Sequence, residues 1–426
     1  MPIALNNPKP KSSHLKLFLT GHAASSMGTR MQTAALLWHI YDITESPVAL
    51  GALGLAEWVP LMLLSLVGGD VADRFNRRTI IALAQVIQIL PSIVLGFMTL
   101  WGAEHLGMLY GVAALGAGAQ AFDGSARKAL IPQLAVPNEL PKAMSAMDLA
   151  KNTAKLGGPA LMGVVAATVG LGWVYVLNGL SFGLMLAAIW MLPVDRGAVP
   201  ESNTSEPFMV RLRAGITFMR KSRVVRGLIL LDFWGTFCAG AETLLPMVAD
   251  EVLGLGVEGY GILATGGAIG ALLAGVFLVW KPPGRGVGLW VFGASSLYGF
   301  STIGFGVAAE VSLVFVALMM IGAADTVSTV LRNTMVQLAT PDGFRGRVTA
   351  LSMIFSKSGP RLGQMEAGLV AGWFGVTASL VSGGILALLT TGILAVRYSS
   401  ILSLQSMTDV TPVKALPDEE VSGTRD

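Results

Sequence analysis

Long apolar runs constrain the fold of this chain more than any other feature. A helix must be roughly 20 residues long to cross a bilayer core about 30 Å thick. The 426 residues are 53% hydrophobic and only 13% charged, and runs of that length occur throughout. We predict twelve transmembrane helices, near 16–41, 48–70, 79–101, 107–124, 147–169, 172–193, 227–248, 260–280, 288–308, 311–331, 352–373 and 376–397. The predicted fold class is therefore an all-α membrane protein.

Lysine and arginine lie on one side of this predicted topology. Of the 29 Lys and Arg residues, all fall on the same side except Arg30, which lies inside the first predicted helix. The connections on the opposite side contain acidic residues but no Lys or Arg. Because cytoplasmic connections are enriched in these two residues, both termini are predicted to be cytoplasmic. We expect a multi-pass protein of a bacterial plasma (inner) membrane.

Two short motifs recur at nearly the same spacing. QLAVP at 133–137 resembles QLATP at 337–341, with an offset of 204 residues. A Gly-Pro pair follows each motif, with an offset of 201 residues. Such a duplication is typical of secondary transporters built from two similar halves. The predicted parts are a cytoplasmic tail at 1–15, a six-helix bundle at 16–193, a cytoplasmic linker at 194–226, a second six-helix bundle at 227–397 and a cytoplasmic tail at 398–426.

The second part of the predicted linker has an amphipathic pattern. Phe208, Leu212, Ile216 and Met219 share one helical face, and arginines occupy the others. This pattern predicts a helix lying on the inner leaflet, with a cytoplasmic docking surface as the alternative.

A charged stretch, GGDVADRFNRR, separates the second and third predicted helices. Its spacing, Gly69-x-x-x-Asp73-Arg74-x-x-Arg77-Arg78, resembles the loop signature of the major facilitator superfamily. Asn76 stands where that family usually has a second glycine. Asparagine tolerates the left-handed backbone conformation, so we expect the turn to be retained.

The resemblance extends along nearly the whole chain. MGTRMQTAALLWHIYDIT, SPVALGALGLAEWVP, YVLNGLSF and ETLLPMVADEVLG are similar to the transmembrane secretion effector and enterobactin exporter branch of that superfamily. The same holds for the second half from LRNTMVQLATPDGFRGRVTAL onward. The resemblance implies the major facilitator fold of two pseudo-symmetric halves. It also implies proton-driven export of a siderophore or lipophilic drug-like small molecule by alternating access, with an amphipathic lipid flippase or exchanger as the alternative.

The resemblance also implies roles for the charged stretch. Asp73 would hold a cytoplasmic gate by facing the start of the helix predicted at 352–373, where free N–H groups favour a carboxylate. Arg74 or Arg77 would pair with Asp123 at the inner end of the fourth predicted helix. The alternative is that the arginines of this stretch, including Arg78, only fix the topology.

Charged residues within the predicted membrane helices are candidate site residues, because each needs a partner, a cavity or a protonation role. Arg30 and Glu57 lie at similar depths in neighbouring helices, so an ion pair is expected, and Glu366 could compete for Arg30. This group is either a proton or substrate site or a static packing pair. Asp325 and Glu242 are further candidates for the substrate or proton site, whereas Asp232 is expected at the membrane interface.

Other classes of function lack their motifs. The sequence contains neither a P-loop nor His or Cys at metal-ligand spacing, and Cys238 is its single cysteine. No nucleophile, base and orienting group recur at usable spacing, so an enzyme is not expected. We expect no cofactor and no metal. The expected partners are a small-molecule substrate, protons and the lipid bilayer, without nucleic acid, and the chain is expected to function as a monomer.

Overall fold

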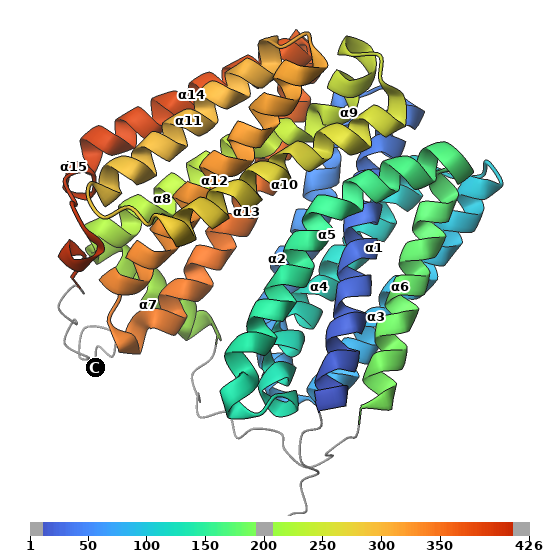
Figure 1. Cartoon of the computed structure of the whole chain (residues 1–426), viewed down its shortest axis with the longest axis horizontal. Coiled ribbons are helices and arrows are strands. Elements are labelled where there is room, and N and C mark those ends of the chain that lie inside the picture. Colours follow the sequence, from blue (N-terminus) through green and yellow to red (C-terminus); the bar gives the residue numbers. More distant parts are fainter. Residues whose placement is uncertain (1–11, 193–207, 412–426) are drawn as a thin grey trace, which may run out of the picture. The chain divides into compact units, whose positions relative to one another are not determined.

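The computed structural model describes residues 12–192 and 208–411, which form helices and short connections without a strand (Figure 1). The predicted tail at 1–15 and tail at 398–426 therefore lie partly outside the described residues, as does the first part of the linker at 194–226. The first half of the chain forms α1 (Ser12–Thr44), α2 (Pro47–Arg74), α3 (Arg77–Leu100), α4 (Leu106–Leu134), α5 (Leu140–Val169) and α6 (Leu171–Met191). The second half forms α7 (Phe208–Lys221), α8 (Arg223–Phe237), α9 (Leu245–Met247), α10 (Gly256–Trp280), α11 (Val287–Val307), α12 (Val311–Ala339), α13 (Arg345–Phe374), α14 (Val376–Arg397) and α15 (Ser399–Leu402).

Helices occur where the apolar runs predicted them. Within the described residues, seven helical segments are long and apolar enough to cross a membrane. They are Pro47–Ser65, Arg77–Leu100, Leu171–Met191, Arg223–Val252, Gly256–Trp280, Val311–Ala339 and Val376–Arg397. The other five predicted spans coincide with helices α1, α4, α5, α11 and α13, and for these the crossing stays a prediction.

One predicted span is not a single α-helix. The helix expected at 227–248 ends at Phe237 and continues as a 3-10 helix, Cys238–Leu244, and a π-helical turn, Val248–Val252. Close packing explains the break. A Cβ atom at Gly240 would lie 2.1 Å from the carbonyl carbon of Gly363 on α13, so the two backbones touch where no side chain intervenes. Local 3-10 and π geometry of this kind often marks a functional or strained segment.

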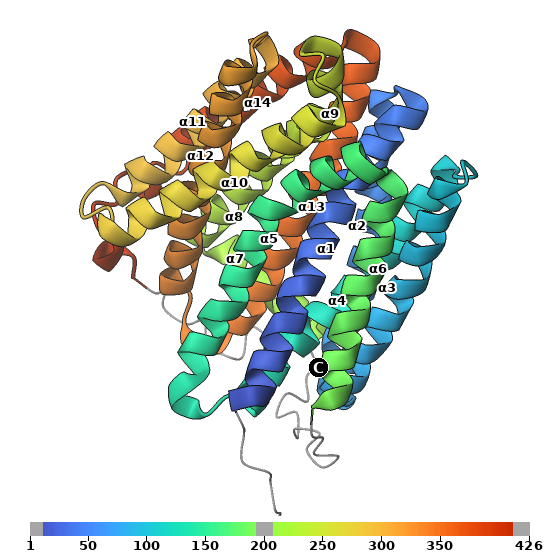
Figure 2. The same cartoon turned by 45° about the vertical axis from the view of Figure 1, so that its right-hand side comes forward.

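Contacts group the chain into two compact units. The first comprises Met1–Glu45, Ala56–Ser205 and Leu255–Thr265, and the second comprises Ser46–Leu55, Glu206–Gly254 and Gly266–Asp426. In the first unit, α1 packs against α5 and α6, and α3 packs against α4 and α6 (Figure 1, Figure 2). A buried polar contact joins three of these helices: the Gln32 Oε1 atom accepts hydrogen bonds from Ser92 (2.9 Å) and from Asn178 (2.7 Å).

In the second unit, α11 packs against α12 and α14, and α13 packs against α8 and α14. The amphipathic helix of the linker, α7, packs on the protein rather than presenting its whole apolar face to a leaflet. Phe218 is buried and its ring stacks on Phe344, with the centroids 5.0 Å apart, and Ile216 and Met219 pack against the same core. Whether the rest of this helix contacts the inner leaflet or forms a cytoplasmic docking surface stays a prediction. The side chains of Phe208 and Leu212 lie outside the described residues.

The segment that follows α14 is also folded onto the second unit. The backbone N–H groups of Val287 and Gly288, at the start of α11, donate to the carbonyls of Gln405 and Leu404. The Tyr398 hydroxyl accepts a hydrogen bond from Arg226 Nε at 3.1 Å. The first residues of the predicted tail therefore bind the ends of α8 and α11.

Candidate functional site

Two buried arginines lie shortly before the repeated motifs of the two halves. Arg127 on α4 precedes QLAVP, and Arg332 on α12 precedes QLATP. Their side chains are 6% and 4% exposed, respectively. Because a guanidinium stays protonated in proteins, each arginine places a permanent positive charge among buried helices and requires hydrogen-bond acceptors there.

In the first unit, Arg127 collects acceptors from two helices. Its Nε donates to Asp123 Oδ1 at 2.8 Å, its Nη1 donates to His22 Nδ1 at 2.8 Å, and its Nη2 donates to Ser25 Oγ at 3.2 Å. Since the guanidinium is the donor, Nδ1 of His22 accepts and carries no proton. Gln85 on α3 also donates to Asp123 Oδ1, at 3.4 Å. The cluster thus joins α1, α3 and α4.

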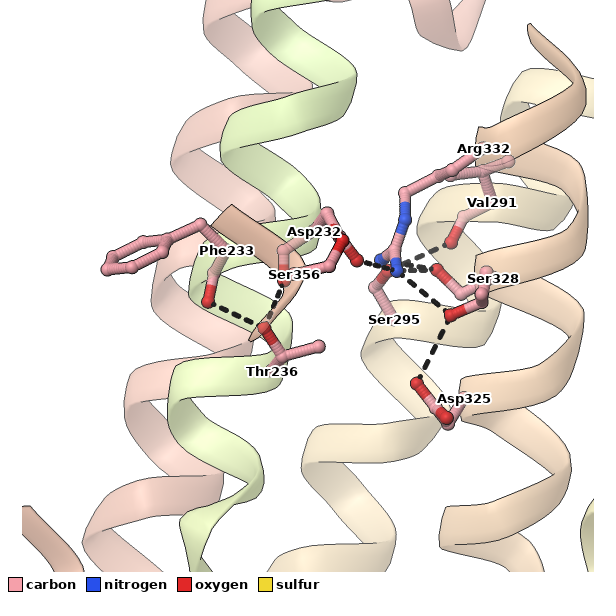
Figure 3. Close-up of polar contacts among 10 residues, drawn as sticks. Asp232, Phe233, Thr236, Val291, Ser295, Asp325, Ser328, Arg332 and Ser356 are labelled. Atoms are coloured by element: carbon pink, nitrogen blue, oxygen red, sulfur yellow. Dashed lines mark hydrogen bonds and ion pairs between the residues drawn. The ribbon is translucent and has the colours of Figure 1, made fainter. Parts of the chain in front are cut away.

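In the second unit, the acid comes from a different helix. Arg332 Nη2 lies 2.5 Å from Asp232 Oδ1 on α8, and Figure 3 shows the two side chains facing each other. The second carboxylate oxygen of Asp232 accepts a hydrogen bond from Ser356 Oγ on α13. Both oxygens of one carboxylate are therefore engaged, each by a neighbouring helix. Asp232 therefore connects α8, α12 and α13, and its expected place at the membrane interface stays a prediction.

Hydroxyl groups complete the surroundings of Arg332. Its Nη1 donates to Ser328 Oγ at 3.0 Å, and its Nη2 donates to Thr329 Oγ1 at 3.1 Å. Thr329 in turn donates to Asp325 Oδ1 at 3.3 Å (Figure 3). The predicted site residue Asp325 is therefore linked to Arg332 through one hydroxyl.

The two clusters differ in where the acid stands. In α4 the acid, Asp123, lies four residues before Arg127 on the same helix. In α12 the residue four positions before Arg332 is Ser328. The acid that binds Arg332 is Asp232, on α8. Protonation of Asp232 would weaken a contact between helices, whereas the Asp123–Arg127 pair is a contact within one helix.

The connection between α2 and α3 is shorter than predicted, because α2 ends at Arg74 and α3 begins at Arg77. Gly69, Asp73 and Arg74 lie in the last part of α2, where the side chains are outside the described residues, so their predicted roles stay predictions. Asn76 does not use the left-handed conformation that asparagine tolerates, because its φ is −60° and its ψ is 119°. Asn76 is instead the N-cap of α3, and its Oδ1 accepts from the Arg78 backbone N–H at 2.9 Å.

The two arginines that follow Asn76 bind carbonyl oxygens of neighbouring helices. Arg77 Nη1 donates to the Ala129 carbonyl on α4 at 2.8 Å, and Arg78 Nη2 donates to the Trp190 carbonyl on α6 at 2.7 Å. Within the described residues, the bonds of Asp123 go to Arg127 and Gln85 rather than to Arg77. These arginines therefore attach the start of α3 to α4 and α6.

The structure places the remaining predicted site residues separately in the two units. Arg30 is exposed and Glu57 is buried, and both belong to the first unit. Glu366 is half-buried on α13, and Glu242 is exposed in the 3-10 helix beside Gly267 of α10, both in the second unit. The shared site of Arg30, Glu57 and Glu366 stays a prediction.

Arg30 nevertheless has a defined neighbour. A Cβ atom at Gly158 on α5 would lie 2.5 Å from Arg30 Cβ, so α1 and α5 approach each other closely only because residue 158 has no side chain. This glycine is the first residue of the repeated Gly-Pro pair.

Sequence reasoning did not find the bonded partners of Arg332 and Arg127. The available signal was Asp232 inside an apolar span and Arg332 directly after the predicted helix at 311–331 of the same half, since a membrane-buried charge is usually paired. For a metal, the described residues contain no group of three or more His, Cys, Asp or Glu side chains that could hold one.

Comparisons with known proteins were made for the sequence and for the fold. The family model of transmembrane secretion effectors matches residues 11–424. An enterobactin exporter, EntS, of Shigella boydii serotype 18 is 30% identical over 355 residues, which are 80% of this chain and 80% of that protein. An uncharacterised MFS-type transporter, YfiS, of Bacillus subtilis (strain 168) is 24% identical over 389 residues, 87% of this chain and 90% of that protein.

Solved transporter structures share the fold. A POT family transporter in complex with 5-aminolevulinic acid has a TM-score of 0.74 at 13% identity, covering 92% of this chain and 98% of that one. A bacterial homologue of the human lysosomal transporter Spinster has a TM-score of 0.68 at 16% identity, covering 93% and 97%. These relatives are transporters and not enzymes. The chain therefore belongs to the transmembrane secretion effector family of the major facilitator superfamily, and it is a multi-pass secondary transporter.

Proposed function

We propose that this transporter exports a siderophore or a lipophilic drug-like small molecule by alternating access, in exchange for protons. We place it in the plasma (inner) membrane of a bacterium with both termini cytoplasmic, as the Lys and Arg distribution predicts. The similarity to enterobactin exporters supports the substrate class, because it extends over 80% of each chain.

The contact between Asp232 and Arg332 carries the proposal of proton coupling. The Asp232 carboxylate has the Arg332 guanidinium as its counter-charge at 2.5 Å, and it loses that counter-charge when the arginine moves away. We propose that a proton replaces the arginine as the partner of Asp232 in one conformation of the alternating transporter and leaves in the other. Its second bond, to Ser356, means that the same proton also changes the attachment of α8 to α13.

The remaining predicted residues are assigned supporting roles in this proposal. Arg30 and Glu57 would contact the transported molecule or a proton from the first unit. Glu366, Glu242 and Asp325 would do so from the second unit. Asp73 would close the cytoplasmic gate together with Gly69, Arg74, Arg77 and Arg78, and Asp123 would support it through Arg127 on α4.

Transport by purified protein in liposomes tests the proposal, with enterobactin as the probe. Vesicles with an imposed pH gradient should accumulate enterobactin, and nigericin, which collapses that gradient, should abolish the accumulation. The Asp232→Asn variant should lose gradient-driven accumulation while still exchanging enterobactin down its own gradient. The matched control is Asp342→Asn, since Asp342 is 86% exposed and pairs at the surface with Arg345.

Three outcomes would contradict the proposal. Accumulation that persists with nigericin would show that protons do not drive transport. A normal gradient response of Asp232→Asn would remove this residue from the coupling. Translocation of a fluorescent phospholipid, without enterobactin transport, would favour the lipid flippase alternative.

A further inference from the structure

A groove runs between α11 and α12 in the second unit. Its volume is about 400 Å³, within the range of roughly 300–1,000 Å³ that small-molecule pockets occupy. Its lining comes from the start of α11, the middle of α12 and the connection before α11. The lining residues are Arg285, Gly286, Leu289, Trp290, Gly293, Ala294, Leu297, Ala323, Ala324 and Val327.

The groove is lined mainly by apolar and small residues. Leu289, Gly293 and Leu297 follow each other at four-residue spacing along one face of α11. Leu289 is 65% exposed, so no other part of the described chain covers its side chain. A Cβ atom at Gly293 would meet no atom within 4 Å, which confirms that the groove is open at that point.

A single charged residue, Arg285, lines the groove, at one end. The connection that contains it, KPPGRG at 281–286, includes Lys281 and no acidic residue. Both basic side chains are exposed, and the described part of the chain offers the Arg285 guanidinium no ion pair. Gly286, whose φ is +68°, lets the chain turn directly from Arg285 into α11. A positive charge thus stands at the mouth of an apolar groove.

We propose that this groove binds one anionic phospholipid, with an acyl chain between α11 and α12 and its phosphate on Arg285. Arginine recognises phosphate through two parallel N–H donors, and juxtamembrane basic residues attract anionic lipids. The apolar walls offer hydrogen-bonding side chains only at the Arg285 end and at Trp290, which fits a lipid better than a polar chelate. The inference depends on the membrane location of the chain and not on its transported substrate.

Trp290 provides a direct optical test, because it lines the groove and is 40% exposed. The protein is placed in nanodiscs that contain an equal fraction of either brominated phosphatidylglycerol or brominated phosphatidylcholine, since bromine quenches tryptophan on contact. The contribution of Trp290 among the nine tryptophans is obtained by subtracting the Trp290→Phe variant. We expect the anionic lipid to quench Trp290 at least twofold more than the zwitterionic lipid.

Matched variants separate the headgroup contact from the groove. In Arg285→Gln, the anionic and the zwitterionic lipid should quench Trp290 equally. Arg285→Lys should retain the stronger quenching by the anionic lipid. Gly293→Leu should fill the groove and lower quenching by the anionic lipid. The control Gly304→Leu lies on the same face of α11, roughly 16 Å further along, where an added side chain also meets open space. It should leave the quenching unchanged, and circular dichroism checks that each variant is folded.

Equal quenching by the two lipids in the unmodified protein would overturn the proposal. So would quenching that is unchanged in Gly293→Leu, because the acyl chain would then lie outside the groove. If the siderophore probe relieves the quenching, the groove belongs to the transport path and the lipid assignment is wrong. None of these results depends on whether transport is coupled to protons.

Discussion

The carboxylate of Asp232 on α8 binds the guanidinium of Arg332 on α12 at 2.5 Å, across 100 residues of sequence. The buried arginine before the repeated motif of the first half, Arg127, binds an acid four residues earlier on its own helix. Both arginines are buried, and they take their counter-charges from different places in the chain. In the second half, the ion pair itself therefore joins two helices, α8 and α12.

Replacing Asp232 by Asn should strongly destabilise the protein. Arg332 keeps its charge and its burial, and breaking a buried ion pair by removing one partner costs about 3–5 kcal/mol. The surface control Asp342→Asn should cost less than about 1 kcal/mol. Unfolding of the purified protein in detergent, followed by circular dichroism, measures both. Further replacement of Arg332 by Gln should recover part of the loss, and a double variant no better than Asp232→Asn would contradict the ion pair as the cause.

Replacing Arg127 by Lys should also destabilise the protein, although the charge is retained. An ammonium group cannot reproduce the fork that reaches Asp123, His22 and Ser25 together, and buried acceptors left without donors cost about 1–3 kcal/mol. The control is the reverse substitution, Lys128→Arg, at the neighbouring position. Lys128 is exposed, so this variant should change the stability little. If the two exchanges shift the melting temperature equally, Arg127 is held by its charge alone.

Replacing Gly158 by Ala should separate α1 from α5. The added Cβ atom would lie 2.5 Å from Arg30 Cβ, and overpacking of a close contact costs typically about 1–3 kcal/mol. Gly124→Ala in α4 is the control, because its added Cβ atom meets nothing within 4 Å. It should be neutral or stabilising by up to about 1 kcal/mol, since Gly is less favourable than Ala in a helix. Equal melting temperatures of the two variants would show that the contact with Arg30 is not tight.

Replacing Asn76 by Ala should cost about 1 kcal/mol through loss of the N-cap of α3. Asn76→Asp should retain most of the stability, because a carboxylate accepts the same backbone hydrogen bond from Arg78. Thermal unfolding in detergent compares these variants with Asn76→Gly. A glycine variant clearly more stable than the parent would indicate a left-handed residue 76 and would contradict the capping geometry.

The positions of the helices could be predicted from sequence, because apolar runs of membrane-spanning length report directly on helix formation. The break after Phe237 could not, since it depends on backbone contact between Gly240 and Gly363, far apart in sequence. The partner of α7 was missed for a similar reason. An apolar face looks the same whether it contacts lipid or, as Phe218 does, the ring of Phe344.

The sequence indicated several candidate site residues but not which residues bind one another. Charged residues such as Asp325 and Glu57 could be named as candidates from their place in apolar runs, and their roles stay predictions. The pairing of Asp232 with Arg332 depends on how α8 and α12 are rotated toward each other, which a single sequence does not contain. The capping role of Asn76 was obscured because the family signature favours a glycine there, and α2 continues as a helix to Arg74.

The most direct test of the account is proton movement during transport by the Asp232→Asn variant. Proteoliposomes are loaded with a pH-sensitive dye, the siderophore probe is added to one side, and the internal pH is recorded. The account predicts that siderophore movement changes the internal pH for the unmodified protein and for Asp342→Asn, and that Asp232→Asn transports without the pH change. A pH change of normal size in Asp232→Asn would contradict it.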